Sequence, residues 1–151
     1  GGPNHEELCS LIGIYEYIEQ FYSHHFDQDK KTLREKINKV NELIAEHEER
    51  IANPLLEYLN SRNDIKLIGQ KKIKNKNRAP TISFYSNKIS SKNLSKHLVQ
   101  NEIATRNDNF YAWRCLKALG INTKDGVVRT SMVHYNSEED TNKLIEVLMK
   151  I

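Results

Sequence analysis

The sequence predicts an α+β fold in which a long N-terminal helical hairpin precedes a small, mainly antiparallel sheet with helices on one face. Three observations lead to this fold class. Apolar residues recur at helical spacing through residues 5–60. From Asp64 onward, short apolar runs alternate with turn residues. Residues 126–151 pass from a period-two pattern into a helical one. The resulting order, β-β-α-β-α-β-α after the hairpin, is typical of a sheet covered by helices.

Two long helices account for the N-terminal part. Residues 5–23 carry apolar side chains every three or four positions, and Asn4 is the expected N-cap. Residues 31–60 predict a second amphipathic helix, in which Pro54 is expected to cause a kink because proline removes a backbone donor. We therefore assign residues 1–62 to a helical arm.

Residues 63–151 are assigned to a small C-terminal domain. Its strands and helices are shorter, and serine, asparagine, aspartate and glycine separate them. The expected elements are strands at 65–68 and 79–85, a helix from Ser90 or Ser91 to Glu102, a strand at 103–106, a turn at 107–109, and a helix at 110–119 ended by Gly120.

The last strand is the most informative segment. Residues 127–135 alternate in the manner of a strand, and Arg129 lies within it. Ser137 and Asp140 have the spacing of a capping box that begins the terminal helix. A guanidinium held on a strand can present two parallel donors to a carboxylate. The alternative is that Arg129 pairs with an ordinary surface carboxylate.

Composition excludes several classes of function. The chain has 151 residues and a formal charge of +3, from 23 basic and 20 acidic residues, which is too balanced to indicate nucleic-acid binding. It has no apolar run of membrane length and no signal peptide, so we expect a cytoplasmic protein with no membrane partner. Cys9 and Cys115 have no metal-type spacing and are expected to be buried free thiols.

Two further clusters invite a functional interpretation. Five basic residues gather between residues 71 and 78, but they lack the stacking aromatics of a single-strand binder, so we expect a solvated loop and no nucleic acid. His24, His25 and His47 have no third ligand at useful spacing, so we expect no metal site and a solvated His47. The basic residues are Lys71, Lys72, Lys74, Lys76 and Arg78.

Several motifs, in this order, resemble cysteine desulfurase-like proteins of the class V aminotransferase group, which are fold-type I pyridoxal-phosphate enzymes. The motif at residues 126–139, GVVRTSMVHYNSEE, carries most of the resemblance. Weaker matches are GGPNHE at 1–6, RAPTISF at 78–84, IATR at 103–106 and FYA at 110–112.

The resemblance implies that the chain is the C-terminal part of a larger transferase or lyase. Such enzymes hold pyridoxal phosphate through a lysine in an upstream domain, and no lysine here has a matching context. We therefore expect this chain alone to bind no cofactor and to be inactive. Its expected partners are the upstream cofactor-binding domain, an amino-acid substrate and, in the parent enzyme, a second copy forming a homodimer.

The resemblance also implies roles for individual residues. Arg129 matches the position that binds the substrate α-carboxylate. Gly2 stands where relatives commonly have a threonine near the cofactor phosphate, and Asn4 is a further cofactor-binding candidate. Asn109 and Tyr111 fall in the active-site loop, which in cysteine desulfurases carries the persulfide cysteine. That cysteine is missing here, so persulfide chemistry is not expected.

Two other classes of function stay open from the residues alone. The chain could be a stand-alone basic α+β binding module. It could also be a helical interaction domain whose hairpin packs on a partner.

Overall fold

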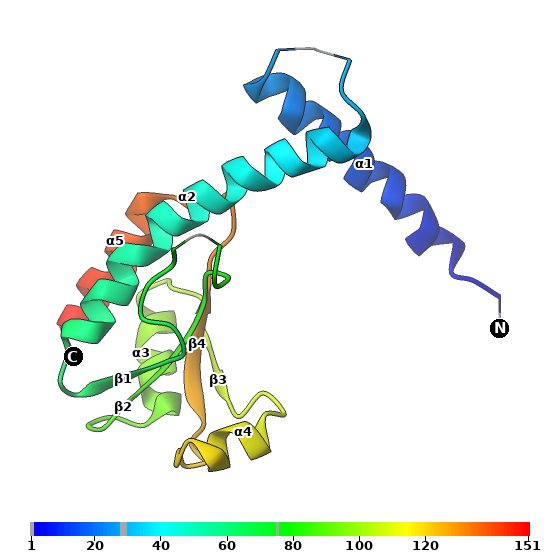
Figure 1. The fold of residues 1–151 in the computed structure, drawn as a ribbon. Helices are drawn as coiled ribbons and strands as arrows, with labels where there is room; N and C mark the ends of the chain where they lie inside the picture. The colour runs from blue at the N-terminus through cyan, green and yellow to red at the C-terminus, as the bar shows by residue number, and fades with distance from the viewer. Residues whose placement is uncertain (1, 28–29, 75) are drawn as a thin grey trace. The chain divides into compact units, whose positions relative to one another are not determined.

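The computed structural model describes residues 2–27, 30–74 and 76–151. The chain divides into two compact units, Gly1–Glu46 and His47–Ile151 (Figure 1). The long helix α2 (Leu33–Ser61) contributes to both units, and each unit is described by itself. The assignment of residues 1–62 and 63–151 to separate domains stays a prediction.

The first unit contains α1 (His5–His25) and the beginning of α2. Lys36 of α2 donates to Glu19 of α1 at 2.6 Å, and its ammonium lies 5.6 Å from the ring centroid of the buried Tyr22. Much of the apolar surface of α1 nevertheless faces solvent, and the exposed side chains include Leu8, Leu11, Ile12 and Ile14.

The second unit contains a four-stranded sheet in which every neighbouring pair of strands is antiparallel. This confirms the predicted α+β class. In spatial order the strands are β1 (Ile65–Ile68), β2 (Thr81–Ser86), β4 (Val127–Ser131) and β3 (Arg106–Asp108).

The main core lies between one face of the sheet and three helices, α2, α3 (Ser91–Gln100) and α5 (Glu138–Met149) (Figure 1). Side chains alternate across a strand, so Val128 points into this core while Val127 points to the other face. There Val127 packs with Leu116 of the short helix α4 (Trp113–Ala118). The fully buried core side chains include Ile51, Leu55, Leu56, Ile82, Phe84, Leu98 and Val128.

The predicted capping box at the start of α5 is confirmed. Ser137 Oγ accepts from the Asp140 backbone N–H, and the Asp140 carboxylate accepts from the Ser137 N–H at 3.0 Å. The preceding strand ends at Ser131, earlier than predicted, because a loop intervenes. His47 of α2 holds this loop through a 2.8 Å hydrogen bond between its Nε2 and Asn136 O. His47 is half-buried, so the expectation of a solvated residue was wrong.

The predicted strand at 103–106 and turn at 107–109 were wrong by about three residues, since β3 occupies Arg106–Asp108. Ile103 N donates to Leu98 O at 3.0 Å, and Glu102 has a left-handed backbone with φ of 63°. Residues 102 and 103 therefore end the preceding helix. Asn107 and Asp108, typical turn residues, form the strand because β4 supplies their backbone partners.

Gly126 allows the chain to enter β4 beside the end of β3. It has φ of 68°, and a Cβ there would overlap the Asp108 carbonyl and lie 2.8 Å from Asn109 N. Its own carbonyl accepts from the buried Ser91 hydroxyl at 3.2 Å. No side chain fits at this crossing, so the glycine sets the path of the chain leaving β3.

Gly126→Ala should destabilise the chain more than Gly120→Ala. Both glycines have positive φ, 68° and 70°, but a Cβ at Gly120 meets nothing within 4 Å. Gly120→Ala should cost about 1–2 kcal/mol for the backbone conformation alone. Gly126→Ala adds an overlap with backbone, which should cost about 1–3 kcal/mol more. Denaturant unfolding of both variants measures the difference, and equal costs would show that the close approach does not constrain the fold.

Candidate functional site

Arg129 lies on the sheet face opposite the main core. Its neighbours in β4, Val128 and Thr130, are buried against the helices, so the Arg129 side chain points the other way. Ser83 of β2 and Arg106 of β3 pair with it on either side. The sequence correctly placed an arginine on a strand, and the structure adds the two strands that flank it.

Phe110 supports the Arg129 guanidinium. The central carbon of that group lies 4.3 Å from the Phe110 ring centroid, which is a cation–π contact. A ring stacked on the guanidinium plane leaves the N–H groups at its edges available for hydrogen bonds. Among the hydrogen bonds and ion pairs of residues 2–27, 30–74 and 76–151, none joins Arg129 to a carboxylate. The described structure therefore contains no surface carboxylate paired with Arg129.

A hollow of about 220 Å³ adjoins Arg129 at the sheet edge. Arg106, Thr105 and Ala104 line one side, and Ser131 lines the other together with Arg129. The lining residues include two arginines and Ser131, whereas the Thr105 hydroxyl is bonded to Ser95 at 3.0 Å, and none of them is acidic. Such a set of donors suits an anion.

The loop after β3 carries the predicted residues Asn109 and Tyr111. Asn109 Oδ1 accepts from the Tyr111 backbone N–H at 3.0 Å, so the Asn109 side chain shapes the loop. Phe110 and Tyr111 both have left-handed backbones, with φ of 51° and 60°. The Tyr111 side chain is fully exposed. Asn109 therefore supports the loop that carries the Phe110 ring, and Tyr111 is free to meet a ligand or another part of the protein.

Both cysteines are exposed, so the expectation of buried thiols was wrong. Cys115 lies on α4, which buries only Leu116, and Cys9 lies on α1, whose neighbouring apolar residues are themselves exposed. Apolar neighbours in the sequence suggested burial of both cysteines, but no other part of the described structure packs on these helix faces.

The predicted cofactor-binding residues Gly2 and Asn4 lie at the start of α1, in the first unit. Asn4 is the helix N-cap, and its Oδ1 accepts from the Glu7 backbone N–H at 3.2 Å. Gly2 is exposed, and nothing lies within 4 Å of the position of a Cβ. Only the backbone of Gly2 and the unused donors of Asn4 are left to contact a phosphate.

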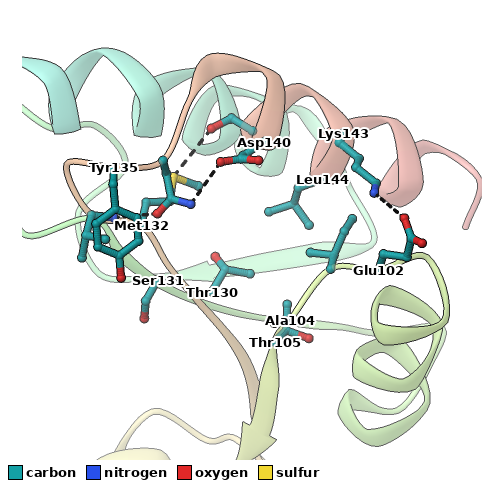
Figure 2. A pocket seen from close by; sticks show the side chains of 14 residues that line it. Glu102, Ala104, Thr105, Thr130, Ser131, Met132, Tyr135, Asp140, Lys143 and Leu144 are labelled. Carbon is teal, nitrogen blue, oxygen red and sulfur yellow. Dashed lines mark hydrogen bonds and ion pairs between the residues drawn. The ribbon is translucent and has the colours of Figure 1, made fainter.

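A second hollow, of about 470 Å³, opens where β3 and β4 separate (Figure 2). It shares Ala104, Thr105 and Ser131 with the hollow beside Arg129. The buried Thr130 hydroxyl lines it and has no hydrogen-bond partner among the described residues. At its rim Lys143 donates to Glu102 at 3.0 Å and lowers the pKa of that carboxyl.

The other candidate clusters have structural roles or lie apart. Within the described part of the chain, no group of three His, Cys, Asp or Glu side chains could hold a metal ion. The five basic residues at 71, 72, 74, 76 and 78 lie outside helices and strands. Arg78 donates to the Thr81 carbonyl at 3.0 Å, and Lys72 pairs with Glu57 at 3.7 Å. None of the described helices is long and apolar enough to cross a membrane.

The sequence did not identify Arg106, Phe110 or Thr130 as site residues. Arg106 and Phe110 fall within recognisable motifs, but their relation to Arg129 depends on strand register and loop conformation. No sequence signal indicated that the Thr130 hydroxyl would be buried without a partner.

Comparison with known proteins identifies the family. The sequence profile of class V aminotransferases matches residues 31–144. The chain is 33% identical over 106 residues to the aminotransferase-like protein FGM3 of Gibberella zeae, which covers 70% of this chain and 26% of that protein.

Solved structures of cysteine desulfurases share the fold. The enzyme from Thermococcus onnurineus NA1 superposes with a TM-score of 0.63 at 24% identity, over 78% of this chain and 29% of its own. CsdA of Escherichia coli superposes with a TM-score of 0.58 at 18% identity, over 83% of this chain and 32% of its own. The chain thus spans about a third or less of these relatives. With a profile match across most of its length, the chain belongs to the class V aminotransferase family.

Proposed function

We propose that this chain is the C-terminal part of a pyridoxal-phosphate-dependent class V aminotransferase or cysteine desulfurase-like enzyme, in which Arg129 binds the α-carboxylate of an amino-acid substrate. One observation supports this most strongly. The Arg129 guanidinium stacks on Phe110 and has no carboxylate partner among the described residues. A stacked, unpaired guanidinium is prepared to bind a planar anion.

The residues of this chain do not fit the whole cofactor. Neither unit offers a lysine in the sequence context of the family, and the Asn4 carbonyl oxygen is engaged in capping α1. We infer that the ring and its anchoring lysine belong to a domain upstream, and that residues 2–4 contribute at most to the phosphate. Pyridoxal phosphate, when bound, acts as the electron sink for bond breaking at the amino acid.

The contribution of this chain is then to bind and orient the substrate. Two parallel N–H donors from Arg129 fix the position and the plane of a carboxylate, which a lysine ammonium cannot do. The Phe110 ring holds the guanidinium in place, and β4 is a central strand that cannot shift without breaking pairings on both sides. Orientation of this kind lowers the entropic part of an activation barrier.

The exposed apolar residues of α1 favour an upstream partner. Leu8, Leu11, Ile12 and Ile14 are each more than half exposed, at 52–60%. Contiguous apolar surface of this kind marks a contact site. We infer that it packs on the cofactor-binding domain of the same protein, in a cytoplasmic homodimer. The second candidate is that this surface packs on a separate protein. In that case the 151-residue chain should be folded and monomeric on its own, and it should bind its partner without the upstream domain.

Arg129→Ala in the full enzyme should raise KM for the amino acid about 10- to 100-fold, because a charge-assisted contact to the substrate is lost. The cofactor should stay bound, since Arg129 is not expected to touch it. Arg129→Lys should recover only part of the loss, because lysine keeps the positive charge but lacks the two parallel N–H donors of a guanidinium. Steady-state kinetics and the absorption spectrum of the cofactor measure the two effects.

Arg34→Ala is the matched control. Arg34 is exposed on α2 in the first unit, and KM should not change. An unchanged KM for Arg129→Ala would remove Arg129 from the substrate site.

Pyridoxal phosphate added to the purified 151-residue chain should give no saturable new absorption band, because the chain lacks the anchoring lysine. The measurement is a spectrophotometric titration, with borohydride reduction and peptide mapping to detect any modified lysine. Random modification of several exposed lysines is the expected background. Saturable modification of one lysine would contradict the proposal that the anchoring lysine belongs to an upstream domain.

A further inference from the structure

Arg106 and Arg129 form a cross-strand pair. They lie directly opposite each other in the antiparallel pairing of β3 with β4. Side chains opposite each other leave the sheet on the same face, and neighbouring strands lie about 4.8 Å apart. Both residues line the hollow of about 220 Å³. Two positively charged side chains thus leave the sheet side by side at its edge.

This arrangement is electrostatically unfavourable without an anion. Like charges directly opposite each other destabilise a pair of strands. Asp108 lies on the same face two residues along β3, but its Oδ1 accepts from Asn109 N at 2.6 Å. No ion pair of the described residues involves Asp108, Arg106 or Arg129. Neither arginine is therefore engaged in an ion pair among the described residues.

The hollow between them is polar and small. The Ser131 hydroxyl is exposed there, whereas the Thr105 hydroxyl is bonded to Ser95 at 3.0 Å. Ala104 contributes the only purely apolar side chain. A hydrocarbon group would gain little from these walls, while an anion would meet Arg106 and a hydroxyl donor.

We propose that Arg106 binds a second anionic group of the substrate, so that the site selects an amino acid whose side chain ends in a carboxylate. The inference rests on the proposed function of Arg129. Arg129 holds the α-carboxylate, and Arg106 holds the side-chain carboxylate in the hollow beside it. Aspartate and glutamate have carboxylates separated by a short chain, which matches the separation of side chains on neighbouring strands.

Two other arrangements account for an unpaired Arg106. Both arginines could bind one carboxylate, or Arg106 could pair with an acidic residue of the upstream domain. Each alternative predicts a different dependence on the substrate side chain. If both arginines bind one carboxylate, loss of Arg106 weakens the binding of every amino acid equally. If Arg106 pairs with the upstream domain, its loss does not discriminate between charged and neutral amino acids.

The test compares isosteric substrates in the full enzyme. Dissociation constants for aspartate against asparagine, and glutamate against glutamine, are measured from the change in the cofactor absorption spectrum. Arg106→Gln should weaken binding of aspartate or glutamate about 10- to 100-fold and leave asparagine, glutamine and alanine unchanged. Arg129→Gln should weaken binding of all of them. Arg114→Gln, an exposed arginine of α4 outside the hollow, is the control.

The outcomes separate the two claims. Equal losses for charged and neutral substrates in Arg106→Gln, or no loss at all, would overturn the assignment of Arg106 and leave the role of Arg129 intact. If Arg129→Gln changes no dissociation constant, the proposed function itself fails.

The 151-residue chain gives a second readout that needs no cofactor. Arg106→Gln should raise its unfolding temperature without ligand, because a like-charge neighbour is removed. Succinate should raise the unfolding temperature of the unaltered chain more than succinamate does, and Arg106→Gln should abolish that difference. A lower unfolding temperature for Arg106→Gln, or equal effects of the two ligands on the unaltered chain, would count against the proposal.

Discussion

The pairing of β3 with β4 is the constraint on which the candidate site depends. It is only three residues long, yet it places Arg106 opposite Arg129 and delivers the chain into the loop that carries Phe110. Gly126 permits it, because any side chain there would overlap the backbone leaving β3. The backbone hydrogen bonds therefore fix where the two arginine side chains leave the sheet and where the loop that carries Phe110 begins.

Because side chains alternate along β4, the strand contributes to the main core on one face and to the candidate site on the other. Val128 and Thr130 are buried on the side of α2, α3 and α5, where apolar contacts stabilise the sheet. Arg129 and Ser131 lie on the opposite side, where a charged group and a hydroxyl line a hollow. Arg106 pairs with Arg129 across the two strands, and a like-charge pair of this kind adds nothing to the stability of the sheet. Such local conflicts are expected at binding sites.

The sequence predicted those features that depend on local pattern. Alternation identified the strand that carries Arg129, and residue spacing identified the capping box of Ser137 and Asp140. Sequence patterns failed where contacts with distant parts of the chain determine the conformation. Residues 107 and 108 have turn propensity but join the sheet because β4 offers hydrogen bonds, and the pairing of Arg106 with Arg129 depends on a register that no local pattern encodes.

The position of Phe110 could not be predicted from the sequence either. Its contact with Arg129 requires a left-handed backbone that a bulky aromatic residue rarely adopts. Propensity rules describe common conformations, so they assigned residues 110–119 to one helix, whereas α4 begins only at Trp113. Phe110, which completes the candidate site, is thus a residue whose conformation departs from the local preference.

The loop shows why such a departure persists. Two consecutive left-handed residues, Phe110 and Tyr111, cost about 1–2 kcal/mol each. The hydrogen bond from Tyr111 N to Asn109 Oδ1 offsets part of this cost. The Phe110 ring gains the contact with Arg129, but the fully exposed Tyr111 side chain gains nothing within the described structure. A strained backbone that presents an exposed aromatic side chain next in sequence to Phe110, which contacts Arg129, is the kind of local outlier that motivates a functional hypothesis for this loop.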